Sequence, residues 1–380
     1  MTASPWQRPL GTVRCDVAIV GAGVIGAATA YALSHLAPGL RVVVVDAARV
    51  ASGASGRNAG FLLLGTHADY ASAADAYGRD TARRVWAFTA EALAEALALA
   101  GSGAVRTGSA LAAGSPGEAV RLERSQAMLA EEGIKSLWHS GSPAGTSGFA
   151  GTLVVHDGGT VDPVRFVRRL VAASGADVRE DTRVERVEPA GSGVRLVLDG
   201  GGAVEAERVL VATNPRAGDL VPSLVGVVRP VRAQMLATVP VAACLPVPVY
   251  SHDGYYYVRQ APDGRVLVGG ARHLHEAAEV GHGDETTSAL QADLEAYLAA
   301  HIPAAAGVPV ERRWAGTMGF SPDGLPILAD VPGVPGAVVA AGFTGHGMGY
   351  GMRFGRLAAR HLLGVADDAE TLFAAARPAS

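Results

Sequence analysis

The sequence predicts an α/β protein in which a domain with a parallel sheet is interleaved with an α+β domain on an antiparallel sheet. Three observations support this prediction. Two apolar, β-branched runs near the N-terminus flank a glycine-rich turn and a helical pattern. The same succession of strand, glycine-rich loop and helix returns at residues 337–364. Between these units, longer alternating runs at 227–271 are typical of antiparallel strands.

The N-terminal unit reads strand, turn, helix and strand. Residues 15–20 (CDVAIV) form the apolar run expected of a strand that is buried on both faces. Residues 27–37 carry apolar side chains at helical spacing, and Pro38 and Gly39 end that helix. Residues 41–46 (RVVVVD) form the second strand, so these segments together make a βαβ unit.

The remaining elements follow from the same patterns. A long helix is expected over 81–100, where apolar side chains form one stripe. The stretch 101–150 is rich in Gly and Ser and yields no assignment. Further helices are predicted at 164–174, 285–301 and 352–364, and further strands at 177–180, 182–190, 194–199, 207–213, 227–239, 255–260, 265–271 and 337–341.

Composition narrows the functional classes. The 380 residues are 49% hydrophobic and 18% charged, which requires a large folded core and excludes disorder as the main state. A net charge of −4 provides no basic footprint for nucleic acid or an anionic membrane surface. The apolar run at 17–33 is interrupted by glycines, so we expect a cytoplasmic protein without a membrane span.

Lysine usage excludes two common cofactor chemistries. Lys135 is the only lysine, and it stands in the sequence EEGIKSLW. A Walker-type loop needs a lysine directly after its glycines, and pyridoxal-phosphate enzymes need a lysine that forms a Schiff base. Lys135 offers neither context.

The sharpest motif is Gly21-x-Gly23-x-x-Gly26, which follows a strand and opens a helix. In such a turn the first glycine permits the bend, the second lets a pyrophosphate approach, and the third lets helix and strand pack closely. Asp46 ends the second strand, where an acid binds a ribose diol and repels a 2′-phosphate. The motif therefore predicts a dinucleotide site, and by itself it leaves FAD and NAD open.

Two further glycine-rich segments favour a flavin. ASGASGRNAGF (51–61) follows the ribose acid, and its small residues suit a backbone that runs beside a long anionic cofactor. GFTGHGMGYG (342–351) lies between a strand and a helix, so its N–H groups and the helix dipole meet at one point. Such donors stabilise the negative charge that a reduced flavin acquires near N1 and O2.

These residues resemble the D-amino-acid-oxidase (DAO) superfamily of FAD-dependent oxidoreductases, which includes glycine oxidase, sarcosine oxidase and γ-glutamylputrescine oxidase. The matching pieces span nearly the whole chain in the family's order. They are DVAIVGAGVIGAATAYAL, VVVVDA, GASGRNAGF, GTVDP, TRVERVE, ERVLVATN, RPVRAQ, RRWAGTMGFSPDGLPIL and AAGFTGHGMGYG. GASGRNAGF is most similar to the γ-glutamylputrescine oxidase branch.

The resemblance implies a Rossmann-like FAD-binding domain interleaved with a substrate domain whose antiparallel sheet covers the flavin. We assign residues 1–75, 150–222 and 310–380 to the FAD-binding domain, and 76–149 and 223–309 to the substrate domain. The residues expected to bind FAD are Gly21, Gly23, Val24, Ile25, Gly26, Asp46, Ser52, Ser55, Gly56, Arg57, Asn58, Ala59, Gly60, Val184, Thr213, Gly316, Gly345, His346, Gly347 and Met348.

The chain departs from its relatives at several family positions. Gly316 stands where sarcosine oxidase tethers its flavin through cysteine, so FAD is expected to be non-covalent. Met318 stands where glycine oxidase has a carboxylate-binding arginine. Gly349 and Leu267 fall near the substrate-site and oxygen-activating lysines of sarcosine oxidase. Either the substrate is an amine without an α-carboxylate, or another arginine binds that group.

The catalytic candidates are His346, Tyr257, Arg272 and Met318. Tyr255, Tyr257 and Arg259 alternate onto one strand face, where they either hold an amine or form ordinary cross-strand packing. Arg259 or Arg272 is available to pair with a carboxylate. His346 either orients the flavin or is a loop histidine bonded to backbone.

A polar segment, which comprises His273, His275, Glu276, Glu279, His282 and Asp284, matches no closed zinc pattern. We expect a solvated loop there and no metal site.

The function expected from the resemblance is oxidation of the C–N bond of an amine or amino acid. A hydride passes from the substrate to flavin N5, and the imine hydrolyses. Oxygen or another carrier then accepts the electrons. The alternatives are an FAD-dependent 2-hydroxy-acid dehydrogenase on the same scaffold, an NAD-dependent dehydrogenase, and a non-catalytic binding subunit that flavin stabilises. Substrate identity, stereochemistry and oligomeric state are left open.

Overall fold

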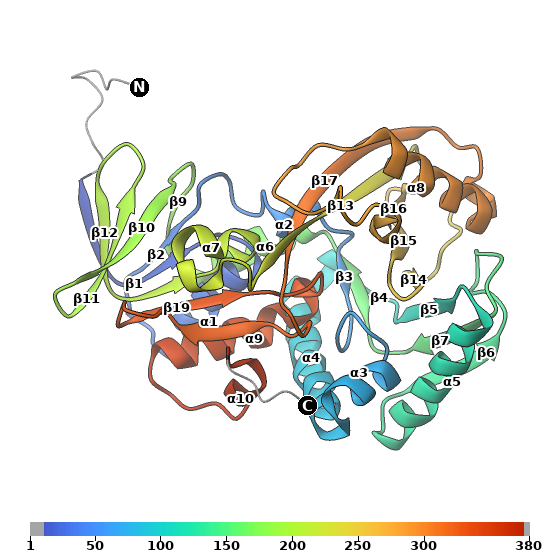
Figure 1. Cartoon of the computed structure of the whole chain (residues 1–380), viewed down its shortest axis with the longest axis horizontal. Coiled ribbons are helices and arrows are strands. Elements are labelled where there is room, and N and C mark those ends of the chain that lie inside the picture. The colour runs from blue at the N-terminus through green and yellow to red at the C-terminus, as the bar shows by residue number, and fades with distance from the viewer. Residues whose placement is uncertain (1–10, 376–380) are drawn as a thin grey trace.

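The computed structural model describes residues 11–375, so the outermost parts of the predicted domain ranges, 1–10 and 376–380, lie outside it. Figure 1 shows two large sheets in separate halves of the molecule, with β13–β17 on one side and β1, β2 and β10–β12 on the other. Long helices lie beside the first sheet, whereas α8 lies against the second.

The first sheet has eight strands, and its centre is parallel. β1 (Thr12–Val20) pairs in parallel with β2 (Val42–Val45) and β12 (Ala203–Val211). The other strands are β9 (Asp177–Arg179), β10 (Val184–Ala190), β11 (Gly193–Leu198), β18 (Ile327–Asp330) and β19 (Ala337–Ala341). Because these strands come from the beginning, middle and end of the chain, this half of the molecule is interleaved with the other half.

The second sheet also has eight strands, in the order β17-β13-β16-β15-β14-β5-β7-β6. Its pairs are antiparallel except for the parallel pair of β14 with β5. The strands are β5 (Ser109–Ala113), β6 (Ser136–Ser140), β7 (Gly151–Val155), β13 (Arg229–Thr238), β14 (Val249–Ser251), β15 (Tyr256–Gln260), β16 (Val266–Gly270) and β17 (Val310–Phe320). α8 (Ser288–His301) buries its apolar side chains in the core beneath this sheet.

A third, small sheet joins the two halves. It consists of β3 (Phe61–Leu62), β8 (Gly159–Val161) and β4 (Ala104–Arg106). The remaining helices are α1 (Val24–Leu36), α2 (Ala54–Arg57), α3 (Tyr70–Tyr77), α4 (Arg79–Ala100), α5 (Pro116–Glu131), α6 (Pro163–Ser174), α7 (Ala217–Leu220), α9 (Gly347–Leu362) and α10 (Glu370–Phe373).

The architecture confirms the predicted fold class, an α/β fold with a mixed parallel sheet and a largely antiparallel second sheet. β7 and β17 lie in the second sheet, whereas the predicted ranges 150–222 and 310–380 place them in the FAD-binding domain. The division into domains otherwise stays a prediction. Within residues 11–375, no helix combines the length and apolarity that crossing a membrane requires.

Residues 101–150, for which the sequence predicts no helix or strand, contain β4, β5, α5 and β6. β5 reads SALAA, and small residues carry little of the alternation that marks a strand. α9 begins at Gly347, five residues before the predicted start at 352. Its first turns are glycine-rich because they lie against other backbone: a Cβ on Gly349 would come within 2.6 Å of the Leu63 carbonyl oxygen.

α1 and α9 cross at van der Waals distance. A Cβ on Gly355 would come within 2.5 Å of the Ala28 Cβ, and one on Gly351 within 2.8 Å of Val24. Both helices are buried on their facing sides, and their residues share one hydrophobic core with the first sheet. The crossing therefore sets the distance between the two glycine-rich turns that precede these helices.

Gly355→Ala should lower the free energy of unfolding. The added carbon would lie 2.5 Å from the Ala28 Cβ and 2.6 Å from the Ala28 backbone carbon, so its cost should fall at the upper end of the usual range, about 3 kcal/mol. That cost outweighs the roughly 1 kcal/mol that alanine gains over glycine in a helix. Equilibrium urea unfolding measures the difference. Gly117→Ala is the control, since nothing lies within 4 Å of its Cβ in α5, and it should be neutral or stabilising. Equal stability of the two variants would contradict the tight crossing.

Candidate cofactor and substrate site

Close packing requires glycine at three positions of the N-terminal turn, residues 21–26. Gly21 has φ +107°, and a Cβ there would lie 2.7 Å from the Ala212 carbonyl oxygen. A Cβ on Gly26 would lie 1.9 Å from the Gly21 carbonyl oxygen, so α1 and β1 meet without an intervening side chain. A Cβ on Gly23 would lie 2.9 Å from Ser55 Oγ. Of the first amides of α1, the Val24 N–H is bonded to Ser55, and the positive dipole end of the helix is left open to a phosphate.

Asp46 follows β2 and holds this turn in place. Its carboxylate accepts hydrogen bonds from the Ala22 N–H at 2.7 Å and the Ala48 N–H at 2.9 Å. Each carboxylate oxygen has two lone pairs, so both oxygens keep capacity for a ribose hydroxyl. The predicted ribose acid therefore also has a structural role.

The loop at 51–60 runs between the two large sheets. Ser55 Oγ accepts a hydrogen bond from the Val24 N–H at 2.9 Å, which ties α2 to α1. Arg57 donates from Nη1 to the Ala315 carbonyl at 3.0 Å, and the Trp314 indole donates to the Arg57 carbonyl at 2.8 Å. Asn58 Oδ1 accepts from the Gly60 N–H at 2.6 Å. The loop is thereby attached to β17 in the second sheet.

The second glycine turn lies between β19 and α9. Gly345 has φ +82°, and a Cβ there would lie 3.5 Å from Met318 Sδ. The Thr344 N–H donates to the Gly319 carbonyl at 2.9 Å, so the turn is fixed to β17. Gly347 and Met348 begin α9, and both residues line a cavity.

A cavity of about 950 Å³ connects the two glycine turns. Fourteen of the predicted cofactor residues line it: Gly21, Gly23, Val24, Ile25, Asp46, Ser52, Ser55, Arg57, Asn58, Val184, Thr213, Gly345, Gly347 and Met348. Thr213 Oγ1 is buried here and has no hydrogen-bond partner among residues 11–375. The length, the two helix N-termini and this orphaned hydroxyl fit a long dinucleotide.

Six predicted residues do not line this cavity: Ala59, Gly316 and His346 line a smaller cavity next to it, whereas Gly26, Gly56 and Gly60 line neither. Cβ atoms on Gly56 and Gly60 would lie 2.0 Å from the Ala51 carbonyl and 2.2 Å from the Val161 carbonyl. These glycines shape the backbone behind the wall rather than the wall itself.

A smaller cavity of about 130 Å³ adjoins the C-terminal glycine turn. It shares Arg57, Asn58, Met318, Gly345 and Met348 with the large cavity. Its other walls include Ala59, Gly316, Tyr257, Arg272 and His346, so the structure brings all the catalytic candidates to one place.

Arg272 is the most notable of these candidates. Its guanidinium lies over the Tyr255 ring at 4.9 Å and over the Phe320 ring at 5.4 Å. Among residues 11–375, no carboxylate pairs with it and no group accepts a hydrogen bond from its side chain. Contact with both rings orients the planar cation while its donors stay available to an anion.

The tyrosines of β15 have separate roles. Tyr257 lies in the wall beside Phe61 and Tyr250, and burial raises the pKa of its phenol to about 12. Tyr256 points into the core on the other face and stacks on Tyr297. Arg259 is buried and donates to the Gly60 and Val161 carbonyls at 3.4 and 3.2 Å, so it fixes the loop instead of facing the cavity.

His346 stands at the head of α9 and lines the small cavity. Its Nδ1 is buried without a hydrogen-bond partner in the described part of the chain. Burial, together with the neighbouring His67 and Arg272, lowers the pKa of this imidazole to about 3, and the Thr344 backbone acts in the opposite direction. His346 is therefore neutral near neutral pH.

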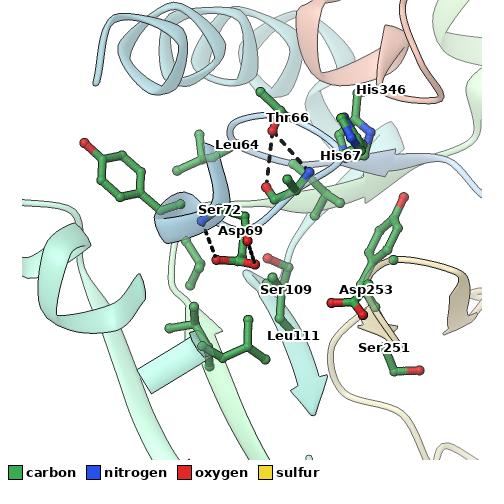
Figure 2. A pocket seen from close by; sticks show the side chains of 18 of the residues that line it. Leu64, Thr66, His67, Asp69, Ser72, Ser109, Leu111, Ser251, Asp253 and His346 are labelled. Carbon is green, nitrogen blue, oxygen red and sulfur yellow. Dashed lines mark hydrogen bonds between the residues drawn. The ribbon is translucent and has the colours of Figure 1, made fainter. Parts of the chain in front are cut away.

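His67 was not predicted from the sequence. It lines the same cavity, and burial lowers the pKa of its imidazole, with Arg272 acting in the same direction. Figure 2 shows His67 and His346 together at one edge of a neighbouring cavity. Its segment, LLLGTHADY, has no motif, so only the folded arrangement identifies it.

The polar segment at 273–284 pairs with nearby charges. Glu279 binds buried Arg232 at 2.8 Å, and His275 binds Asp293 at 2.6 Å. Among residues 11–375, no group of three or more His, Cys, Asp or Glu side chains is arranged to hold a metal ion.

Comparison with known proteins identifies the family. The family model described as FAD-dependent oxidoreductase (DAO) matches residues 16–361. The chain belongs to this family of FAD-dependent oxidoreductases. The family implies an FAD cofactor, and the elongated cavity with its two glycine turns fits such a molecule.

Relatives in this family span nearly the whole chain. The probable oxidoreductase OrdL of Rhizobium meliloti is 27% identical over 392 residues, which cover 96% of this chain and 88% of the relative. The γ-glutamylputrescine oxidoreductase of Escherichia coli is 26% identical, with 96% and 87% covered. The crystal structure of glycine oxidase from Geobacillus kaustophilus matches with a TM-score of 0.80 and 25% identity, and covers 94% of this chain and 96% of that one.

The His346 pKa makes stability depend on pH. Because the folded pKa of about 3 lies below the ordinary value of 6.5, the unfolded state binds more protons between these values. His346 therefore stabilises the fold above pH 6.5, and this stabilisation is lost as the pH falls toward 3. Between about pH 7 and about pH 5, wild type should lose roughly 2 kcal/mol more than His346→Gln.

Urea unfolding at a series of pH values measures this difference. His139→Gln is the control, because His139 is exposed on β6, and it should follow the wild type. Parallel pH profiles for wild type and His346→Gln would show that His346 is not buried as a neutral imidazole.

Proposed function

We propose that this FAD-dependent oxidoreductase oxidises the C–N bond of an amino acid or a related amine that carries a carboxylate. The unpaired guanidinium of Arg272, in the cavity beside the C-terminal glycine turn, is the observation that carries the proposal. The names of two relatives, γ-glutamylputrescine oxidoreductase and glycine oxidase, support C–N chemistry of this kind.

Because Met318 replaces a carboxylate-binding arginine, either the substrate lacks a carboxylate or another arginine binds it, and Arg272 is that other arginine in our proposal. Met318 on β17 offers no charge, but Arg272 lines the same cavity after β16. A guanidinium binds a carboxylate through two parallel hydrogen bonds, which fixes the orientation of the bound molecule. We therefore propose that the carboxylate-binding arginine has been relocated rather than lost.

When bound, FAD supplies a two-electron acceptor for the hydride on the carbon next to nitrogen, and water hydrolyses the imine product. Arg272 orients the substrate through its carboxylate. Tyr250 and Tyr257, which are half-buried, restrict water in the cavity. His346, which stays neutral, offers a nitrogen as hydrogen-bond acceptor to the amine, but its low pKa makes it a weak base.

The glycine turns and the loop at 51–60 would hold the cofactor. Gly21 and Gly23 with the start of α1 would receive the pyrophosphate, and Asp46 the ribose. Gly345, Gly347 and Met348 would present amides and a positive helix end to the flavin ring. The position that carries a cysteine tether in sarcosine oxidase is Gly316, so we propose that FAD is bound without a covalent bond.

The function is tested by anaerobic flavin reduction. Amino acids, N-methyl amino acids, amines without a carboxylate and 2-hydroxy acids are each mixed with the oxidised holoenzyme, and the flavin absorbance is followed. Arg272→Met should lower kcat/KM for a carboxylate-bearing amine about 100-fold, because a charge-assisted pair contributes roughly 1.5–3 kcal/mol.

The same substitution should change kcat/KM for an amine without carboxylate by less than about threefold. Arg272→Lys, which keeps the charge, should recover part of the loss. Reduction by 2-hydroxy acids alone, or by none of these compounds, would refute the proposal. Admission of air to the reduced enzyme then shows whether oxygen or another carrier accepts the electrons.

Non-covalent attachment has its own test. Acid precipitation of the holoenzyme should leave the flavin in the supernatant, since Gly316 has no nucleophilic side chain to bond it. Absorbance of the washed pellet and of the supernatant measures the distribution. A flavin that stays with the pellet would contradict the proposal.

A further inference from the structure

A second compartment adjoins the small cavity. Its volume is about 290 Å³. The walls that it shares with the small cavity, and which therefore mark the junction of the two, are Leu63, His67, Tyr250, Asp253, Gly254, Tyr255 and His346. The shared walls make it a neighbour of the place where the proposed substrate amine lies. We call it the distal compartment.

The walls of the distal compartment are apolar with an acidic side. Figure 2 shows Leu64 and Leu111 among the apolar side chains, and Asp69, Ser109 and Asp253 directed toward the same space. Glu118 completes the acidic set. Within the described part of the chain, no arginine or lysine lines this compartment.

The nearest cation does not neutralise these acids. Arg121 donates from Nε to Asp69 at 2.9 Å and contacts Asp253 through Nη2. Burial raises the pKa of Glu118, whose two oxygens accept the Gly114 and Asp253 N–H groups, each at 2.8 Å. Even with Glu118 protonated, two carboxylates face one guanidinium, so the compartment remains negative.

The carboxylates of Asp69 and Asp253 differ in how many further hydrogen bonds they can accept. Asp69 is fully engaged, because it accepts from Ser72, Ser125 and Arg121. Asp253 binds Arg121 alone among the described side chains, and 58% of its side chain is exposed. A cation entering the compartment would therefore meet Asp253 first.

Ser109 is an independent sign of a ligand. It is 4% exposed, yet its hydroxyl has no hydrogen-bond partner among residues 11–375 and lines the compartment. The hydroxyl oxygen is not sealed in the protein interior but is accessible from the compartment, so a ligand bound there can form a hydrogen bond with it. An ammonium or guanidinium beside Asp253 would supply the missing donor.

We propose that the distal compartment binds the cationic end of the substrate, so that the substrate class is an amine or amino acid carrying a second ammonium or guanidinium on an aliphatic chain. The proposal rests on the proposed function for the reacting end. The leucines would enclose the methylenes, and Asp253 with Ser109 would bind the terminal cation. A neutral or anionic chain end would lack a partner there.

Binding is tested first, without turnover. Calorimetry with the holoenzyme compares n-alkylguanidinium ions from butyl to octyl with the corresponding alcohols. At its best chain length, the guanidinium should bind about tenfold more tightly than the alcohol. Asp253→Asn should abolish that advantage and Ser109→Ala should reduce it, with the affinity for the alcohol unchanged in both.

Both variants are expected to fold. Asp253 has φ +57°, a conformation that asparagine adopts readily, and Ser109→Ala removes a hydroxyl without a bond to lose. Asp199→Asn, on the exposed turn after β11, is the control and should behave as wild type. An unchanged guanidinium preference in Asp253→Asn, or equally tight binding of alkyl carboxylates by wild type, would overturn the proposal.

Turnover separates this inference from the proposed function. Anaerobic flavin reduction by α,ω-diamines is compared with reduction by monoamines of equal length, and Asp253→Asn should lower kcat/KM about tenfold for the diamines alone. If no amine reduces the flavin, the proposed function fails while the calorimetry still decides the subsite. If amines reduce the flavin regardless of a distal cation, only the subsite is refuted.

Discussion

The close crossing of α1 and α9 is the constraint on which the site depends. Two glycine turns, some 320 residues apart in sequence, can address one cofactor only if the helices behind them approach closely. Gly351 and Gly355 on α9 permit this approach, with Val24 and Ala28 on the facing helix. The hydrophobic core beneath the first sheet holds both helices against the same surface. Small residues in the core are therefore required if both glycine turns are to contact the same cofactor.

Local sequence patterns are sufficient to predict the parallel strands of the nucleotide-binding half. Strand β19 lies at the predicted residues 337–341, and β1 and β2 match their predicted cores, since buried parallel strands are continuous apolar runs. The strands β4 and β5 cannot be predicted from the sequence, because their short runs carry no clear period of apolar residues. The start of α9 is predicted too late, because glycines normally end or interrupt a helix.

The site also contains residues that a sequence motif predicts and residues that only the folded structure identifies. Motif residues such as Gly21, Asp46 and Gly345 lie where the sequence indicates, because each belongs to a turn that its own neighbours define. Arg272 is one of the two arginines that the sequence offers for a carboxylate. Only its contacts with the rings of Tyr255 and Phe320 distinguish it from Arg259, which holds a loop. His67 and Asp253 belong to no motif, since tertiary packing alone brings them beside His346.

The dual engagement of Asp46 has a consequence for how this scaffold can change. The carboxylate that would discriminate against a 2′-phosphate also fastens Ala22 and Ala48 at the mouth of the turn. A mutation that made room for a phosphorylated ribose would release that fastening and disturb the pyrophosphate end as well. Cofactor preference is thus coupled to the integrity of the turn, and a swap of coenzyme would require compensating changes in both loops rather than one substitution.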